Sequence, residues 1–220
     1  MLGLPKSTEF NKRIPKSKFY ENLQLSPELK RCFVEQIKVI YWRNKLSPDT
    51  INLAAGSRVQ ELQVFSIRLN GPALDAAVLR QIDREISYHI VFILEYDGQC
   101  QAWIGYKEQA GPGSSTAFKV TAYYHTDWMP EADLSLHLEG LDLDAVYENF
   151  VRQVAGDQLQ QADENLDTAV KRAQQAEKLE KKIVALETKA GNERQPRRRL
   201  EIRENIRALQ AELKQLQAQP

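Results

Sequence analysis

The pattern of hydrophobic and polar residues changes near residue 156. Short strand-like and helical stretches alternate before this point, and a continuous helical spacing follows it. Before that point, short stretches rich in β-branched and aromatic residues predict strands. These stretches lie at 37–46, 59–70, 88–96, 99–107 and 117–126. Hydrophobic residues three and four positions apart predict helices, the first after the capping residue Ser26 and the last with Asp142 and Asp144 in its first turn. These helices lie at 26–36, 73–86 and 141–154.

The order of these elements predicts an α+β globular domain over residues 1–156. Asp97-Gly98 is typical of a tight turn between two antiparallel strands. The helix at 73–86 joins two strands by a crossover, and such crossovers are right-handed. The stretch at 110–116, rich in glycine and serine, predicts a flexible loop. We therefore expect a mostly antiparallel sheet of about five strands with helices packed on it.

The second part of the chain, residues 157–220, has the hydrophobic spacing of a coiled-coil seam, alternating three and four positions. Gly191-Asn192 predicts a helix end and Pro196 predicts a new helix start. Seam residues on the two sides pair so that their numbers add to 388 or 389 throughout. The sequence thus predicts an antiparallel helical hairpin with its turn near 191–196. The expected interaction seam is formed by Leu179, Ile183, Leu186, Ile206, Leu209 and Leu213.

A two-helix hairpin buries little surface for the entropy that its ordering costs. We therefore expect it to dock on something. The sequence leaves three possibilities open, namely its own globular domain, a second copy of the chain, or a larger protein partner.

Composition limits the class of protein. The chain has 220 residues with 30 basic and 30 acidic side chains, so its formal net charge is zero. This balance argues against a generally basic nucleic-acid coat and against an acidic tail protein. Two cysteines exclude a disulfide framework and a cysteine-rich zinc module. No stretch is long and apolar enough to span a membrane, and no signal peptide is evident, so we expect a cytoplasmic protein with no membrane partner.

Basic residues are nevertheless uneven along the chain. The N-terminal segment carries Lys6, Lys12, Arg13, Lys16 and Lys18, and the hairpin turn carries Arg194, Arg197, Arg198 and Arg199. Such clusters can bind phosphate groups of nucleic acids. Alternatively, the arginines of the turn belong to a solvated helix face on which Glu and Arg form pairs three or four positions apart.

Candidate catalytic residues are few. His89 lies in an apolar strand and is expected to be a core residue, whereas His125 lies at a strand end close to Asp127. A metal-dependent nuclease would require an acidic residue two positions before a strand lysine. Glu95, Asp97 and Lys107 are available, but the position two before Lys107 is Gly105. The sequence therefore predicts no catalytic residues, no metal site and no cofactor.

Several segments together resemble a bacterial family described as domain of unknown function 4391. They are GLPKST at 3–8, KLSPDTINL at 45–53, the strand pair at 88–107, YYHTDW at 123–128 and LEGLDLDAVYENFVRQV at 138–154. The resemblance covers nearly the whole chain and implies no established reaction or site residue. It implies an accessory role beside restriction, methylase or helicase proteins, in anti-phage defence.

Three functions follow from these observations. The first is an accessory or scaffold protein, not an enzyme, that binds a larger partner or a second copy through the hairpin. The second is a nucleic-acid-binding subunit that uses Lys12, Arg13, Lys16 and the arginines of the turn. The third is an unusual metal-dependent nuclease that uses Glu95, Asp97, Lys107 or His125.

Overall fold

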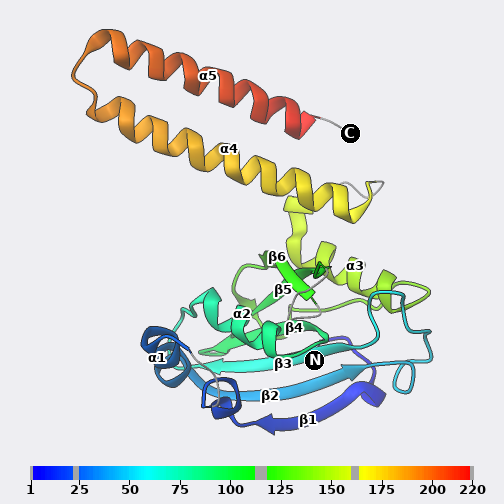
Figure 1. Ribbon diagram of the computed structural model, residues 1–220. Coiled ribbons are helices and arrows are strands. Elements are labelled where there is room, and N and C mark those ends of the chain that lie inside the picture. The colour runs from blue at the N-terminus through cyan, green and yellow to red at the C-terminus, as the bar shows by residue number, and fades with distance from the viewer. Residues whose placement is uncertain (1, 22–24, 112–117, 160–163, 219–220) are drawn as a thin grey trace. The chain divides into compact units, whose positions relative to one another are not determined.

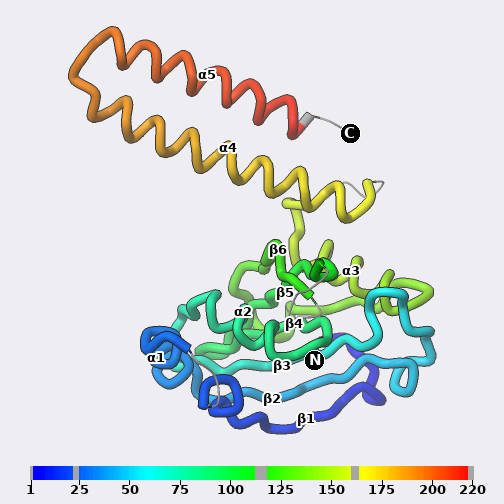
Figure 2. Tube along the Cα trace, in the orientation of Figure 1, coloured from blue at the N-terminus to red at the C-terminus, as the bar shows by residue number. Residues whose placement is uncertain are grey.

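The computed structural model describes residues 2–21, 25–111, 118–159 and 164–218 (Figures 1 and 2). The chain divides into two compact units, Met1–Gly156 and Asp157–Pro220. Residues 112–117, which include most of the expected loop and the first residue of the last expected strand, lie outside the described part.

The first unit is built on one seven-stranded sheet in the order β1-β2-β3-β4-β5-β6, with β7 beside β5. All neighbours are antiparallel except β3 and β4, which are parallel and joined by a crossover through α2. The strands are β1 (Glu9–Ile14), β2 (Ile37–Leu46), β3 (Leu62–Leu69), β4 (His89–Tyr96), β5 (Gln99–Gln109), β6 (Phe118–His125) and β7 (Met129–Pro130).

The fold class is therefore the expected one, but the expected number of about five strands is wrong, because β1 and β7 add two. β1 has no alternating hydrophobic pattern, since it is an edge strand on which Glu9–Arg13 are all exposed. β7 has only two residues, too few to form a sequence pattern.

Three helices cover the sheet, namely α1 (Pro27–Glu35), α2 (Ala76–Glu85) and α3 (Leu143–Ala155). Each starts at a side-chain cap, with Ser26, Asp75 and Asp142 accepting from the backbone N–H of Leu29, Ala77 and Ala145. Asp142 thus precedes α3 and does not lie in its first turn. The connections also contain three short 3-10 helices, namely η1 (Lys6–Thr8), η2 (Lys16–Phe19) and η3 (Gly156–Leu159).

The core on one sheet face contains residues of α1 and α2 together with alternate residues of the strands. One cross-strand row is aromatic: Trp42 pairs with Phe65, Phe65 with Phe92, and Phe92 with Trp103. The side chains between these positions point to the opposite face, because successive strand residues alternate. His89 belongs to that opposite face, where its ring meets Tyr147 of α3 at a centroid distance of 4.4 Å.

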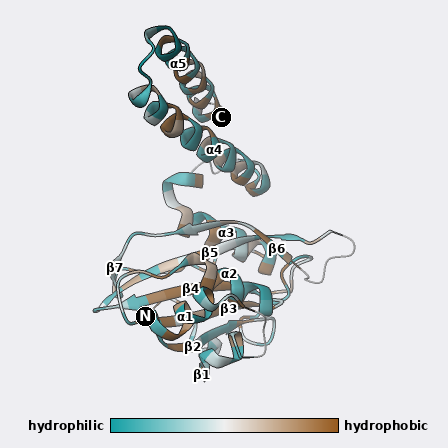
Figure 3. Cartoon of the chain, turned by 60° about the vertical axis from the view of Figure 1, so that its left-hand side comes forward, coloured by the Kyte–Doolittle hydropathy of each residue, from teal (hydrophilic) through white to brown (hydrophobic). Residues whose placement is uncertain are grey.

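The second unit is a helical hairpin of α4 (Leu166–Asn192) and α5 (Pro196–Ala218). α4 continues through Gly191 and Asn192, so the helix end comes slightly later than the Gly-Asn signal suggested. Ile183, Ala190, Ile202 and Ile206 form the buried centre of the hairpin. Figure 3 shows hydrophobic residues concentrated in the sheet and a hydrophilic turn between α4 and α5.

Candidate functional site

The seam residues of the hairpin are packed against each other. Leu186, Leu209 and Leu213 pack on the centre formed by Ile183, Ile202 and Ile206, and Leu179 is also buried. The hairpin therefore closes within one chain. In this conformation the seam is not open to a partner, so an interaction through Leu179, Ile183, Leu186, Ile206, Leu209 and Leu213 would require the two helices to separate.

The outward faces of the hairpin are polar. Val184 and Leu200 are the large hydrophobic residues of the described part of α4 and α5 that are exposed, at 60% and 58%. Neither has a hydrophobic neighbour three or four positions away on the same exposed face, so no second apolar stripe is formed. A coiled-coil dimer through the outside of the hairpin therefore has no hydrophobic seam to use.

The turn of the hairpin carries the expected arginine cluster, and all four arginines are exposed. Arg197 lies 3.8 Å from Glu201, a loose contact in which the arginine side chain is 93% exposed. Arg194, Arg198 and Arg199 form no ion pair with any residue that the structure describes. The alternative of a solvated helix face held by Glu–Arg pairs thus accounts for one of the four arginines at most.

Three of these arginines lie where a positive charge destabilises the helix that carries them. Arg197, Arg198 and Arg199 occupy the first turn of α5, which contains no acidic residue. The N-terminus of a helix carries a partial positive charge, so each cation there is unfavourable by about 0.3–1 kcal/mol. The turn arginines therefore have no evident stabilising role in the hairpin.

The N-terminal basic residues differ in what the fold does with them. Lys16 is used within the fold, because its Nζ donates to the carbonyl oxygens of Val34 at 2.9 Å and Ile37 at 2.6 Å. Desolvation lowers the pKa of Lys16. Lys12 and Arg13 are exposed on the edge strand β1, where Lys12 Nζ lies 5.9 Å from the Phe10 ring centroid. Lys16 thus spends its donors within the fold, whereas Lys12 and Arg13 are open to solvent, and nucleic-acid binding by these residues stays a prediction.

The structure separates the residues of the nuclease hypothesis. Glu95 on β4 pairs with Cys100 on β5, whereas Lys107 lies seven residues further along β5. At about 3.4 Å per residue this places the two positions about 24 Å apart. Lys107 is instead buried, with Nζ 2.9 Å from Asp83 Oδ1. Glu95, Asp97 and Lys107 therefore do not share a site.

His125 is oriented by its strand neighbours, not by Asp127. Its ring stacks on Trp103 at 4.3 Å, and its Nδ1 lies 3.0 Å from the Thr126 carbonyl oxygen. The Trp103 indole N–H can only donate, so the atom of the Gln101 amide that lies 2.7 Å from it is the oxygen. The amide nitrogen of Gln101 then donates to the Thr126 carbonyl oxygen. The same amide nitrogen also lies 3.2 Å from His125 Nδ1, so this ring nitrogen has a donor and an acceptor within hydrogen-bond distance.

Sequence reasoning missed a buried polar cluster between α2, β5 and β6. Lys107 Nζ contacts Asp83 and the Tyr88 carbonyl, and the Tyr123 hydroxyl donates to Asp83. Burial raises the pKa of Asp83, although Lys107 and Tyr123 oppose this. His89 is buried nearby, as expected of a core residue, and burial lowers its pKa to about 3, with a further contribution from Lys107. Asp83, Lys107 and His89 are buried, whereas Tyr123 is partly exposed, so the ion pair itself does not meet solvent.

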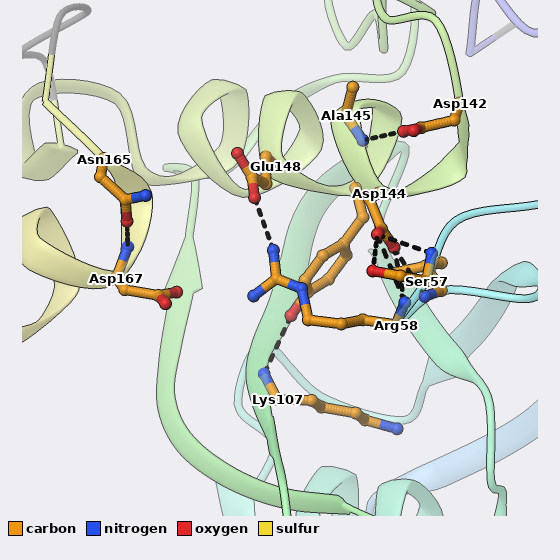
Figure 4. Close-up of polar contacts among 11 residues, drawn as sticks. Ser57, Arg58, Lys107, Asp142, Asp144, Ala145, Glu148, Asn165 and Asp167 are labelled. Atoms are coloured by element: carbon orange, nitrogen blue, oxygen red, sulfur yellow. Dashed lines mark hydrogen bonds and ion pairs between the residues drawn. The ribbon is translucent and has the colours of Figure 1, made fainter.

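A second missed feature joins the loop after β2 to α3 (Figure 4). The Asp144 carboxylate accepts from the backbone N–H of Ser57 at 2.8 Å and Val59 at 2.7 Å, and from Arg58 N–H and the Ser57 hydroxyl. Arg58 also lies 2.6 Å from Glu148. Desolvation raises the pKa of Asp144, but the hydrogen bonds outweigh it and the net shift is downward. This arrangement fixes the loop at 57–59 on α3.

The third missed feature is a charged hollow of about 240 Å³ beside the β4–β5 turn. Arg68, Glu95 and Glu131 line it, and Arg43 bridges the two carboxylates at 3.7 and 2.8 Å. The signal in the sequence was the presence of Lys38 and Arg43 within the strand predicted at 37–46.

In the part of the chain that the structure describes, His, Cys, Asp and Glu side chains form no group of three that could hold a metal ion. Nor does any helix in that part of the chain have the length and hydrophobicity needed to cross a membrane.

Comparison with known proteins gives one match. A family model with the description "Domain of unknown function (DUF4391)" matches residues 2–213. Neither a curated protein nor a solved structure matches the chain.

Proposed function

The chain belongs to the family described as a domain of unknown function, DUF4391, and we propose that it acts as an accessory protein that binds nucleic acid through the arginine-rich turn of its hairpin. The partner that performs chemistry on the nucleic acid would be a separate protein. A place in an anti-phage defence system, which the family resemblance implied, belongs to this same proposal.

One observation carries the proposal. Arg197, Arg198 and Arg199 weaken the helix that carries them, and the hairpin offers them one loose ion pair. Residues that cost stability and remain exposed are most simply explained by a ligand of opposite charge. A phosphate backbone supplies such charge, and at a helix N-terminus it also meets free backbone N–H groups and the positive end of the helix dipole.

The composition of the hairpin favours phosphate contacts over contacts with bases. Every Phe, Trp and Tyr of the chain lies before residue 157. The hairpin thus has no aromatic ring on which an unpaired base could stack. We therefore expect binding to duplex nucleic acid with little dependence on its sequence and with strong dependence on salt.

The experiment is to measure the affinity for duplex DNA at several salt concentrations. In the variant Arg197→Gln/Arg198→Gln/Arg199→Gln, the slope of log K against log salt should fall by about 0.9 for each lost phosphate contact. The matched control removes three exposed lysines of the same hairpin, Lys171→Gln/Lys178→Gln/Lys214→Gln, and should retain the arginine-dependent slope. The arginine variant should also gain about 1–3 kcal/mol of hairpin stability, because three unfavourable charges are removed.

Equal slopes in the two triple variants would refute the proposal. Loss of hairpin stability in the arginine variant would refute the argument from unfavourable charge. Assembly of two chains through the seam is the alternative, and it requires the helices to open. Light scattering of the purified chain separates the two, because a stable dimer that disappears with Ile206→Asp would favour assembly.

A further inference from the structure

The charged hollow on the first unit lies where the two parallel strands end. Arg68 is near the carboxyl end of β3 and Glu95 is near that of β4, and both line the hollow. Ligands of open sheets with parallel strands bind outside the carboxyl ends of those strands. The hollow therefore lies where a sheet with parallel strands would bind a ligand.

The Arg68 guanidinium is held by a hydrogen bond at Nε and by an aromatic ring, and its two terminal nitrogens remain available. Its Nε donates to Glu95 at 3.0 Å, and its Cζ lies 5.6 Å from the centroid of the Tyr41 ring. Glu95 is itself fixed by the Ser66 hydroxyl and by Arg43. The two terminal nitrogens of Arg68 make no hydrogen bond or ion pair with a described residue, and the side chain is 58% exposed. The free end is thus an oriented pair of donors, the geometry that matches two oxygens of one anion.

Lys38 is brought to the same hollow by a bulge in β2. Ile37 pairs with Leu69 and Val39 with Arg68, so Lys38 is the extra residue between two regular pairs. A bulge of this kind changes the direction of a side chain, and Lys38 lines the hollow beside Arg68. Within the described residues its ammonium group forms no ion pair.

The acidic residues of the hollow are unequal. Glu95 and Glu131 are both paired with Arg43, and the Arg43 hydrogen bond is the main reason that the pKa of Glu131 is lowered. Asp97 belongs to the β4–β5 turn and forms no ion pair with a described residue. The groups that can still bind a ligand are therefore the two terminal nitrogens of Arg68, the ammonium group of Lys38 and the Asp97 carboxylate.

We propose that this hollow binds a single phosphate group between the free end of Arg68 and Lys38. Its volume of about 240 Å³ is below that of a site for a drug-sized molecule and is sufficient for a phosphate group. Two sources share this chemistry, namely a small phosphate monoester and the terminal phosphate of a nucleic acid. The proposal concerns the first unit and does not depend on the role of the hairpin.

The test is a titration of the full chain with inorganic phosphate, in which binding is monitored by the amide chemical shifts in two-dimensional NMR spectra. Saturable shifts are expected at Gln99 and Gly98. Arg68→Lys keeps the charge but loses the planar pair of donors, and should weaken phosphate binding about tenfold. Asp97→Asn removes the opposing charge and should tighten binding. Arg84→Lys, on the exposed side of α2, is the matched control and should bind like the unmodified chain.

The affinities for two oligonucleotides, one with a 5′-phosphate and one with a 5′-hydroxyl, identify the source of the phosphate group. They are measured with a chain in which Arg197, Arg198 and Arg199 are replaced by Gln, so that the hairpin turn does not contribute to binding. Preference for a 5′-phosphorylated over a 5′-hydroxyl strand, lost in Arg68→Lys, would assign a nucleic-acid end. Equal weak binding of both strands, with phosphate binding intact, would assign a small phosphate monoester. Absence of saturable phosphate shifts, or equal affinities in Arg68→Lys, Asp97→Asn and the control, would overturn the proposal.

Discussion

Replacing Lys107 by Met tests the energetic account of the buried polar cluster. The Lys107 and Asp83 side chains are 1% and 0% exposed, and Nζ lies 2.9 Å from Oδ1. Lys107→Met leaves the Asp83 carboxylate buried without its cation, which costs about 3–5 kcal/mol. This is a large part of the about 5–15 kcal/mol by which a typical protein is stable. The double variant Lys107→Met/Asp83→Asn removes both charges and keeps an acceptor for the Tyr123 hydroxyl, so it should be more stable than Lys107→Met alone.

Urea unfolding followed by tryptophan fluorescence is the appropriate assay. Trp42, Trp103 and Trp128 all lie in the first unit, so the signal reports that unit and not the hairpin. In Lys107→Met the pKa of Asp83, already raised by burial, should rise further. The folded state then binds more protons than the unfolded state above the ordinary pKa of Asp, so the stability of the variant should fall as the pH rises. A cost below about 1 kcal/mol, or a double variant no more stable than the single one, would refute the reasoning.

Three further outcomes are expected. His89 is neutral in the fold with a pKa of about 3, so the folded state binds fewer protons and stability falls as the pH drops from 6.5 toward 3. His89→Phe should reduce this loss, measured as urea midpoints at pH 7 and 4.5. Asp144→Asn should cost about 1–3 kcal/mol of stability and speed hydrogen exchange at the backbone N–H of Ser57 and Val59. Because the pKa of Asp144 is lowered, its hydrogen bonds to the loop should persist at neutral pH and be lost only as the pH falls below about the ordinary value of 3.8. Ile206→Ala should cost about 2 kcal/mol of hairpin stability and lower the far-ultraviolet circular dichroism, with tryptophan fluorescence unchanged.

The sequence predicted the elements whose pattern is repeated and buried. The strand at 37–46 has the predicted bounds, and Ser26-Pro27 starts α1 as predicted, because a cap and a proline act locally. β1 was missed because all but its last residue are exposed, so burial imposes no pattern on it. Hydrophobic periodicity can report only the residues that a fold removes from water.

The candidate sites were harder to predict, because they depend on which strand lies beside which. Arg68 and Glu95 are 27 positions apart and meet only because β3 and β4 are parallel neighbours in one register. Lys38 joins them only because a bulge interrupts β2, and no residue type marks that bulge in the sequence. The arginines of the hairpin turn needed no such information, since neighbours in the sequence remain neighbours on the turn.

The strand order β1-β2-β3-β4-β5-β6 has a consequence for folding rate, because each strand pairs with the next strand of the chain. The entropy of closing a loop increases by about 0.6 kcal/mol for each doubling of its length. The β4–β5 connection has two residues, whereas the connections before β2, β3 and β4 are many times longer. The β4–β5 hairpin should therefore form first and present an edge to which β3 and then β2 add. This succession keeps contacts local in sequence, which favours rapid folding of a sheet of this size.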